Sequence, residues 1–197
     1  MIKEIVFASS NPGKIKEVTE IFAPLDIKIR PQTDFNVPDI EETGLTFIEN
    51  AILKARNCCA HTGLPALADD SGLEVDILGG APGIYSARYG GDHRNGEKNI
   101  NKLLNELKDI PQEKRSARFQ CWMILMKHDK DPVPQIFNGA WEGFILNAKQ
   151  GDHGFGYDPV FYVPEEDCSA AELTADIKNK LSHRGKALAK MKVFLQK

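Results

Sequence analysis

The segment from residue 2 to residue 29 reads IKEIVFASSNPGKIKEVTEIFAPLDIKI, and its pattern decides the fold. Residues 2–8 are mostly apolar and predict a buried strand, after which residues 9–14 form a polar turn. Residues 15–22 carry apolar side chains at helical spacing until a proline ends the helix. In residues 27–29 isoleucine alternates with lysine, which predicts a second strand. This order of strand, loop, helix and strand is typical of an α/β protein.

The rest of the chain alternates between predicted helices and strands. Thr46 and Glu49 predict a capping box at the start of a helix that ends before Gly63. Residues 65–68 are expected to form a short apolar strand that ends at a pair of acidic residues. The further expected elements are strands at 73–77, 119–126, 135–137 and 141–145, the last three as an antiparallel meander, and helices at 100–107 and 182–195.

The composition is that of a globular protein with no affinity for nucleic acid. The 197 residues suit one domain, and 42% of them are apolar and 27% charged, which is ordinary for a soluble protein. The formal net charge of −3 does not attract a phosphate backbone, so we expect no nucleic-acid partner.

Cysteine usage and hydropathy favour a cytoplasmic location. None of the four cysteines stands in a C-x-x-C pair, so we expect reduced, buried thiols and no zinc cluster. Residues 1–5 lack the long apolar stretch of a signal peptide. No apolar run reaches the ~18 residues that a membrane span needs. We therefore expect a cytoplasmic protein with no membrane partner.

The turn at residues 9–14 is the first candidate binding segment. A helix N-terminus offers unpaired backbone N–H groups and the positive end of the helix dipole, so it suits phosphate. Gly13 would let the backbone come close to a ligand, and the Lys14 ammonium could reach an outer phosphate. A tight turn with a capping serine or asparagine explains the same residues equally well, and the pattern is not a Walker A motif. The segment comprises Ser9, Ser10, Asn11, Pro12, Gly13 and Lys14.

Acidic residues form the second candidate site. Asp69 and Asp70 are expected at the carboxyl end of a strand, where α/β sheets bind ligands. Neighbouring strand residues point to opposite faces, so one carboxylate would ligate magnesium or activate water while the other supports the loop. An Asx turn before Gly72 is the alternative. Glu41 and Glu42 would either add to a magnesium site, which needs only one or two carboxylates, or form a solvated acidic loop.

Two further segments carry groups that suit a purine base. Phe155 or Tyr157 would stack on a base and Asp158 would accept a hydrogen bond from it, although core aromatic residues would fit the same pattern. Lys178 and the pair His183–Arg184 are donors, and a 6-oxo purine presents acceptors at O6 and N7. Adenine presents an amino donor there, so such a site would reject it. Helix capping and surface charge are the alternative.

Seven segments of the sequence together resemble the inosine/xanthosine triphosphate pyrophosphatase family, whose members remove non-canonical purine nucleotides from the precursor pool. Each segment is a weak signal alone, but the seven occur in the family's order and cover nearly the whole chain. They are SSNPGK at 9–14, EETG at 41–44, TFIENA at 46–51, ADDSG at 68–72, PGIYSARY at 82–89, GFGYDP at 154–159 and LSHRG at 181–185.

The resemblance implies an α/β fold with an elongated, mixed, twisted sheet, flanking helices and two lobes around a central cleft, in a single domain of residues 1–197. It implies a magnesium-dependent homodimer. The reaction would convert a nucleoside triphosphate and water into the monophosphate and pyrophosphate, with ITP, dITP and XTP as substrates. Two rival functions are a non-catalytic purine nucleotide sensor and a pyrophosphatase for modified pyrimidine nucleotides.

The resemblance also implies roles for individual residues. Asp70 would be the proton acceptor and a magnesium ligand, with Glu42 or else Glu41 as the second ligand. Residues 9–14 would hold the triphosphate. The remaining implied substrate contacts are Lys54, Ser71 and Arg88, then Phe155, Gly156, Tyr157 and Asp158 around the base, and finally Lys178, His183 and Arg184.

Overall fold

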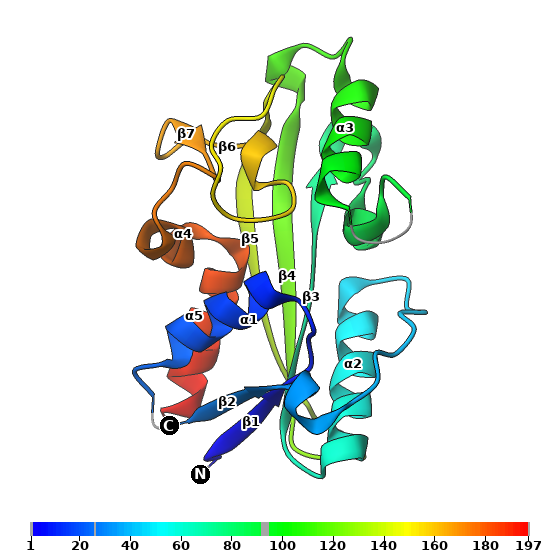
Figure 1. Cartoon of the computed structure of the whole chain (residues 1–197), viewed down its shortest axis with the longest axis vertical. Coiled ribbons are helices and arrows are strands. Elements are labelled where there is room, and N and C mark those ends of the chain that lie inside the picture. Colours follow the sequence, from blue (N-terminus) through cyan, green and yellow to red (C-terminus); the bar gives the residue numbers. More distant parts are fainter. Residues whose placement is uncertain (1, 26, 92–94, 197) are drawn as a thin grey trace. The chain divides into compact units, whose positions relative to one another are not determined.

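The computed structural model describes residues 2–25, 27–91 and 95–196. Residues 1, 26, 92–94 and 197 of the expected single domain lie outside these ranges. The fold is mixed α/β, as the sequence predicts, with a twisted open sheet of seven strands in the order β2-β1-β3-β4-β5-β6-β7 (Figure 1). No helix in the described part of the chain has the length and apolar character that crossing a membrane requires.

The chain divides into two compact units. The first unit lies within residues 1–70, 121–139 and 184–197, and the second within residues 71–120 and 140–183. Three strands contribute residues to both units, namely β3 (Ala66–Val75), β4 (Ser116–Met126) and β5 (Gln135–Ile145).

The other elements belong to one unit each, apart from α5, whose first residue falls in the second unit. The first unit holds β1 (Glu4–Phe7), α1 (Pro12–Phe22), β2 (Lys28–Pro31), the 3-10 helix η1 (Gln32–Phe35), α2 (Phe47–Thr62) and α5 (His183–Leu195) from Arg184 onward. The second holds the 3-10 helices η2 (Asp76–Leu78), η3 (Gly83–Arg88), η4 (Gln112–Lys114) and η5 (Asp158–Val160), with α3 (Gly96–Leu107), β6 (Phe161–Val163), β7 (Cys168–Ser169) and α4 (Ala175–Leu181).

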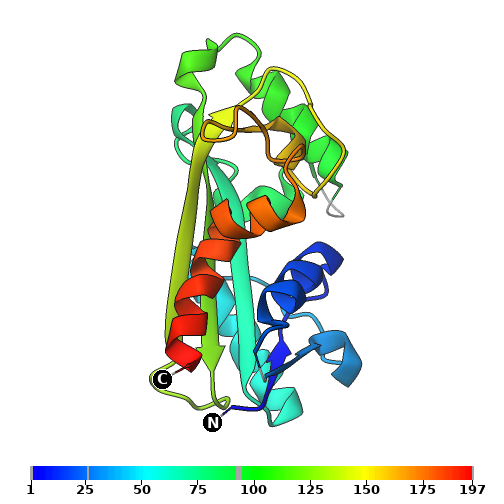
Figure 2. The ribbon, with the colours of Figure 1, turned by 90° about the vertical axis from the view of Figure 1, so that its left-hand side faces the viewer.

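Helices cover both faces of the sheet in the first unit. Strand β1 is parallel to β2 and to β3. Its side chains alternate, so that Ile5 and Phe7 pack with α1 and α5, whereas Val6 packs with α2. Figure 1 shows the same layers, with α1 and α5 on one side of these strands and α2 on the other, and Figure 2 shows α5 lying along the strands. A strand buried on both faces explains why residues 2–8 are continuously apolar apart from two charged residues.

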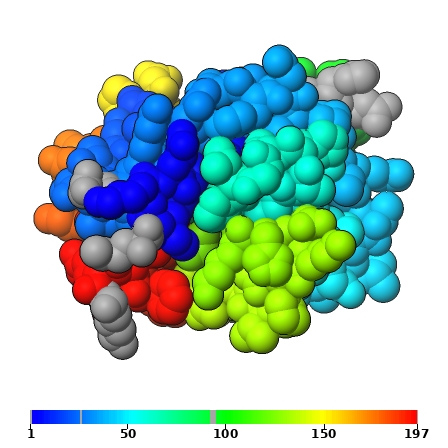
Figure 3. Space-filling model, turned by 90° about the horizontal axis from the view of Figure 1, so that it is seen from below, coloured from blue at the N-terminus to red at the C-terminus, as the bar shows by residue number. Residues whose placement is uncertain are grey.

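Segments from four parts of the sequence meet on one face of the first unit. Figure 3 shows the N-terminal strand (blue), the end of α2 (turquoise), the β4–β5 connection (yellow-green) and the end of α5 (red) side by side. Arg56 of α2 donates a hydrogen bond to the carbonyl oxygen of Asp129, and Lys190 of α5 donates one to the carbonyl oxygen of Asn138 at 2.6 Å. The unit is therefore held together by contacts between residues that are distant in sequence.

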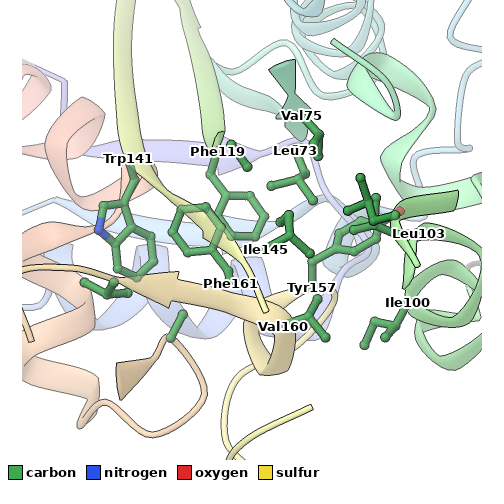
Figure 4. Close-up of a cluster of buried hydrophobic side chains, with 14 of the residues drawn as sticks. Leu73, Val75, Ile100, Leu103, Phe119, Trp141, Ile145, Tyr157, Val160 and Phe161 are labelled. Atoms are coloured by element: carbon green, nitrogen blue, oxygen red, sulfur yellow. The ribbon is translucent and has the colours of Figure 1, made fainter. Parts of the chain in front are cut away.

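The second unit has its own aromatic core (Figure 4). The Phe161 ring of β6 lies 4.6 Å from the Phe119 ring and 5.2 Å from the Trp141 ring, measured between centroids. Helix α3 adds Ile100 and Leu103 to this cluster. Strand β6 is antiparallel to β5 and to β7, so this unit contains antiparallel pairs of the mixed sheet.

Two strand predictions are wrong in their boundaries. The sequence predicts separate strands at 65–68 and 73–77, but β3 runs without a break from Ala66 to Val75 and includes both aspartates. The strands predicted at 135–137 and 141–145 are likewise one strand, β5. Polar residues in a sequence suggest breaks between strands, but buried carboxylates with ionic partners and a solvent-exposed asparagine are both compatible with an extended chain.

Replacing Gly143 by alanine is expected to destabilise the second unit. A Cβ at this position of β5 would come within 2.3 Å of the carbonyl oxygen of Tyr162 and 2.7 Å of the Phe161 ring. Because a paired backbone cannot yield easily, we expect the free energy of unfolding to fall by about 1–3 kcal/mol in urea denaturation. Gly96→Ala is the control, since nothing lies within 4 Å of a Cβ there. Equal losses in the two variants would contradict the close packing of β5 on β6.

Candidate active site

The loop after β1 enters α1 through a capped turn. The Asn11 side chain accepts a hydrogen bond from the backbone N–H of Lys14 at 3.2 Å, and the Ser9 hydroxyl accepts one from the N–H of Asn11 at 3.2 Å. The capping alternative that the sequence left open is therefore present. It does not exclude phosphate binding, because the first turn of a helix has four N–H groups without helical partners. The same turn directs the Lys14 side chain to Asp69.

Asp69 is the centre of a buried ion-pair chain. Only 1% of its surface is exposed. Its Oδ1 accepts from Lys14 Nζ at 2.6 Å, and its Oδ2 accepts from Arg184 Nε at 2.6 Å. Arg184 in turn donates from Nη1 to Glu17 Oε2 at 2.5 Å. We define the buried ion-pair chain as Glu17, Arg184, Asp69 and Lys14; it connects α1, β3 and the start of α5.

The charges of this chain keep Asp69 ionised. Burial opposes ionisation, but Arg184 and then Lys14 outweigh it and hold the pKa of Asp69 well below its usual range. Burial likewise opposes the charge of Arg184, but Asp69 and Glu17 raise the pKa of that guanidinium. Asp69 is therefore a lasting negative partner for two cations and is unsuited to taking up a proton.

Asp70 follows Asp69 in β3 and meets a different lysine, as strand alternation predicts. Lys54 of α2 donates from Nζ to Asp70 Oδ1 at 2.7 Å and to the carbonyl oxygen of Asp69 at 2.7 Å. Glu42 Oε1, from the loop before α2, lies 3.1 Å from the same nitrogen. Three oxygens thus surround one ammonium. We call Glu42, Lys54 and Asp70 the Lys54 cluster.

The Lys54 cluster leaves Asp70 able to act as a base. Burial raises the pKa of Asp70 above its usual value, and the attraction of Lys54 and then Lys14 does not offset this effect fully. Burial would lower the pKa of Lys54, but Asp70 and Glu42 outweigh it, so that pKa is raised. A carboxylate with a raised pKa takes up a proton more readily, so of the two aspartates Asp70 is better suited to proton transfer.

Of the two glutamates expected at a metal site, Glu42 lies in the Lys54 cluster, whereas Glu41 is exposed. No group of three or more His, Cys, Asp and Glu side chains in the described part of the chain is arranged to hold a metal ion. Glu42 and Asp70 still fit magnesium, which takes one or two carboxylates and completes its shell with phosphate and water. The ammonium already bound by these oxygens shows that they favour a cation.

Helix α2 holds the loop that carries Glu42. The predicted capping box is present, since the Thr46 hydroxyl accepts from the N–H of Glu49 at 3.3 Å. Glu49 Oε2 reaches back to the N–H of Leu45 at 2.9 Å. Asn50 Oδ1 accepts from the N–H of Gly44 at 2.8 Å. These bonds fasten the residues after Glu42 to the first turn of α2.

A second charged group lies in the second unit. Asp158 Oδ2 accepts from Lys178 Nζ at 2.7 Å and from the N–H of Phe155 at 2.8 Å. Lys178 Nζ also lies 4.8 Å from the centre of the Phe155 ring. Gly154 has a φ of +78°, and a Cβ there would come within 2.2 Å of Asp158 Oδ2, so glycine alone fits. We call Phe155, Asp158 and Lys178 the Asp158 cluster; it offers an aromatic face, an acceptor and a donor, which suit a purine.

Four residues predicted to contact the base are buried in the second unit, namely Asp158 and Lys178 of the Asp158 cluster and, outside that cluster, Tyr157 and His183. Tyr157 belongs to the hydrophobic core, and its hydroxyl donates to the carbonyl oxygen of Ser86 at 2.9 Å. Its ring therefore packs within the protein, which corrects the prediction that it would stack on a base. The His183 ring is also buried and stacks on Phe119, with 4.8 Å between centroids.

The remaining predicted residues are spread over several elements. Pro12 and Gly13 begin α1. The Ser10 hydroxyl donates to Asp39 Oδ2 at 3.4 Å. Ser71 is half-buried in β3, Gly156 is exposed, and Arg88 is exposed at the end of η3 with its guanidinium 5.0 Å from the centre of the Tyr85 ring.

The sequence analysis names Lys14, Asp69 and Arg184 but predicts neither their pairing in the buried ion-pair chain nor the part of Glu17. Asp69 was expected only to support a loop, and Glu17 was given no role. Glu17 follows Lys14 by three positions in α1, which places both on one helical face and was a usable signal. Nothing local indicates that Asp69 meets Arg184, which lies 115 positions further along the chain.

Comparisons with known proteins find relatives along nearly the whole chain. The model of the Ham1 family matches residues 5–194. A Vibrio cholerae serotype O1 protein named dITP/XTP pyrophosphatase is 55% identical over 190 residues, which is 96% of this chain and 95% of that protein. A Photorhabdus laumondii protein with the same name is 54% identical over 96% of each chain. The solved structure of a HAM1 protein from Coxiella burnetii is 50% identical, with a TM-score of 0.91 over 100% of this chain and 99% of that one.

Asp69→Asn is expected to lower stability much more than Asp70→Asn in metal-free buffer at pH 7. Loss of the Asp69 charge leaves Arg184 and Lys14 without their shared buried partner, which costs about 3–5 kcal/mol of unfolding free energy. Ionised Asp70 is instead disfavoured by burial, and its replacement leaves Lys54 beside Glu42, so the loss of stability should be smaller. Urea unfolding of the two variants beside the parent protein measures the difference.

The effect of Asp69→Asn should also depend on pH. The pKa of folded Asp69 lies below the unfolded value of about 3.9, so its contribution is complete above that pH and is lost as the pH falls through the folded pKa. The stability difference between parent and Asp69→Asn should therefore narrow below about pH 4. A difference that widens in acid, or equal unfolding midpoints for the two asparagine variants, would count against the buried ion-pair chain.

Proposed function

The chain belongs to the Ham1 family, and from this premise we propose that it hydrolyses non-canonical purine nucleoside triphosphates to the monophosphate and pyrophosphate. Relatives that are 54% and 55% identical are named dITP/XTP pyrophosphatase, so dITP and XTP are the first substrates that we propose. ITP carries the same 6-oxo purine base as dITP and is the third. On this proposal the protein is a hydrolase that acts on acid anhydrides and cleanses the nucleotide pool.

The observation that carries the proposal is the contrast between two consecutive carboxylates. Asp69 is fixed as an ion by Arg184 and Lys14, whereas burial raises the pKa of Asp70. A base with a raised pKa beside cations that can bind phosphate is what the activation of water at a triphosphate requires. We therefore assign the proton acceptor to Asp70.

Magnesium is the cofactor that we propose, with Glu42 and Asp70 as its protein ligands in preference to the exposed Glu41. The support is the Lys54 cluster, in which oxygens of these two residues already lie within 3.1 Å of a cation. When bound, magnesium would neutralise charge on the phosphates and on the departing pyrophosphate.

The residues of the first unit would position the triphosphate and the water. Lys14, Lys54 and the N–H groups at the start of α1 would bind phosphate oxygens, and Ser9 to Gly13 would shape that loop. Asp70 would orient a water molecule and accept its proton while the water oxygen bonds to the α-phosphorus. The bond from that phosphorus to pyrophosphate then breaks. Little covalent chemistry is asked of the protein, so positioning and charge provide most of the catalysis.

Residues of the second unit would bind the base. In the Asp158 cluster, Phe155 would stack on the ring while Asp158 accepts from a purine N–H and Lys178 donates to O6. Adenine offers a donor in place of O6, so the Lys178 ammonium would lose its acceptor. We assign lesser contacts to Ser71, Arg88 and Gly156.

We retain His183 and Arg184 as further donors to the base edge. Arg184 already donates to Asp69 and Glu17, so a base would have to share the guanidinium with both carboxylates.

We also propose a homodimer and a cytoplasmic location. Light scattering of the purified protein tests the first of these, and cell fractionation tests the second.

A panel of triphosphates tests the function. With magnesium, the protein should release pyrophosphate from dITP, XTP and ITP in preference to dATP, dGTP and modified pyrimidine triphosphates, detected as phosphate only after inorganic pyrophosphatase is added. Asp70→Asn should lower kcat by about 10²- to 10⁴-fold while the circular dichroism spectrum is kept, because the general base is lost. Binding without turnover would favour the sensor, and a preference for modified pyrimidines would favour the second rival.

Lys178→Met tests the assignment of the base. Loss of a charged donor worth about 1.5–3 kcal/mol should reduce the ratio of kcat/KM for dITP to that for dATP by roughly 10- to 100-fold. Lys180→Met is the matched control, because this lysine lies exposed on the same helix, α4. If Lys178→Met lowered kcat/KM for every base by the same factor, Lys178 would bind phosphate and not the base.

A further inference from the structure

The ammonium of Lys54 lies where the two proposed metal ligands converge. Its Nζ is 2.7 Å from Asp70 Oδ1 and 3.1 Å from Glu42 Oε1. The two carboxylate oxygens therefore cannot be farther apart than the sum of these distances. The Lys54 side chain is 15% exposed and that of Asp70 9%, so water does little to screen the contact.

The hydrogen-bonding capacity of the Lys54 ammonium is matched by its surroundings. An ammonium has three N–H donors and no acceptor. Three oxygens lie around Nζ, those of Asp70, Glu42 and the backbone carbonyl of Asp69. With these contacts, Lys54 provides the positive charge that keeps the carboxylates of Asp70 and Glu42 close together inside the protein.

A divalent cation would compete with the ammonium for the same two oxygens. Magnesium binds oxygen at about 2.0–2.1 Å and tolerates little distortion of its shell. A dication on Asp70 Oδ1 and Glu42 Oε1 would lie next to Nζ, and two cations at that separation repel strongly in a partly buried site. Binding of the divalent cation should therefore weaken the hold of these oxygens on the ammonium.

We propose that Lys54 is a positioning residue that acts as an internal counter-cation, holding Glu42 and Asp70 together without metal and giving up their oxygens when a divalent cation binds. This inference rests on the proposed function, which supplies a new partner for the released ammonium in the phosphates of the substrate. Metal binding and triphosphate binding are then coupled through one side chain, and such coupling is reciprocal. Free protein would bind metal weakly, and metal would bind tightly together with the nucleotide.

Lys14 shows by contrast why Lys54 is the residue concerned. Both lysines lie near Asp70 and raise its tendency to ionise. Lys14, however, donates to Asp69 Oδ1 at 2.6 Å, and Asp69 is fully buried and is not a proposed metal ligand. Lys14 can therefore keep its partner when metal binds, which makes Lys14→Met the matched control for the loss of one positive charge.

The test measures metal binding in the absence of any nucleotide. Manganese is the probe, and its free concentration is followed by electron paramagnetic resonance in titrations of the parent protein, Lys54→Met and Lys14→Met. Removal of the competing ammonium should tighten manganese binding about tenfold or more, within the range usual for coupled sites, and Lys14→Met should change it much less. If Lys54→Met binds manganese with the affinity of the parent protein or more weakly, the proposal is wrong.

A second measurement uses the unmodified protein, in case Lys54→Met folds poorly. Acetic anhydride labels free lysine amines, and peptide mass spectrometry follows each site. Magnesium should increase the labelling rate of Lys54 relative to that of Lys14, and a rate that stays the same or falls would overturn the inference. Neither assay involves turnover, so the counter-cation role can fail while hydrolysis of dITP stands. Absence of hydrolysis in the triphosphate panel would in turn refute the function without touching the binding result.

Discussion

The carboxylate of Asp69 is buried in the first unit, and a carboxylate that is removed from water needs positively charged partners. Its two oxygens are used by Lys14 from the N-terminal helix and by Arg184 from the C-terminal one. Glu17 then balances the guanidinium. Burial of an unpaired ion costs several kcal/mol, so β3, α1 and α5 have to assemble together for any of the four charges to be tolerated. The proposed phosphate-binding loop is thereby tied to the stability of the fold.

The adjacent Asp70 shows how one strand can carry two carboxylates with different chemistry. Asp69 has two cations on its own oxygens, whereas Asp70 shares the ammonium of Lys54 with Glu42 and with a backbone carbonyl. Desolvation is large for both residues, and the balance of attraction decides the sign of each pKa shift. Electrostatics therefore distinguishes the ion-paired Asp69 from Asp70, the proposed proton acceptor, although the two are adjacent in the strand.

Local patterns in the sequence predict the elements but not the long-range pairing. The Thr46 capping box, the opening strand and helix, and the α/β class follow from periodicity and capping, which depend on near neighbours. The continuity of β3 through Asp69 could not be predicted, because the partner that neutralises this residue is far away in the chain. The prediction that Tyr157 stacks on a base is wrong for a related reason, because only the folded structure shows that its ring lies in the core. Short motifs therefore suggest candidate residues, whereas they give no sign of supporting residues such as Glu17.

Because β3 runs without a break, the position of each aspartate along the strand decides which face it lies on and which cation it contacts. Consecutive side chains of a strand alternate between faces, so deleting one residue just before Asp69 would move Asp70 into the place of Asp69 and Ser71 into the place of Asp70, without changing the composition of the motif. The shifted protein would present the proposed proton acceptor to Arg184 and a serine to Lys54. The role of each acid in such a pair therefore follows from its register along the strand. An alignment of distant relatives that misplaces a gap by one column would match Asp69 of this chain with the wrong acid of the other.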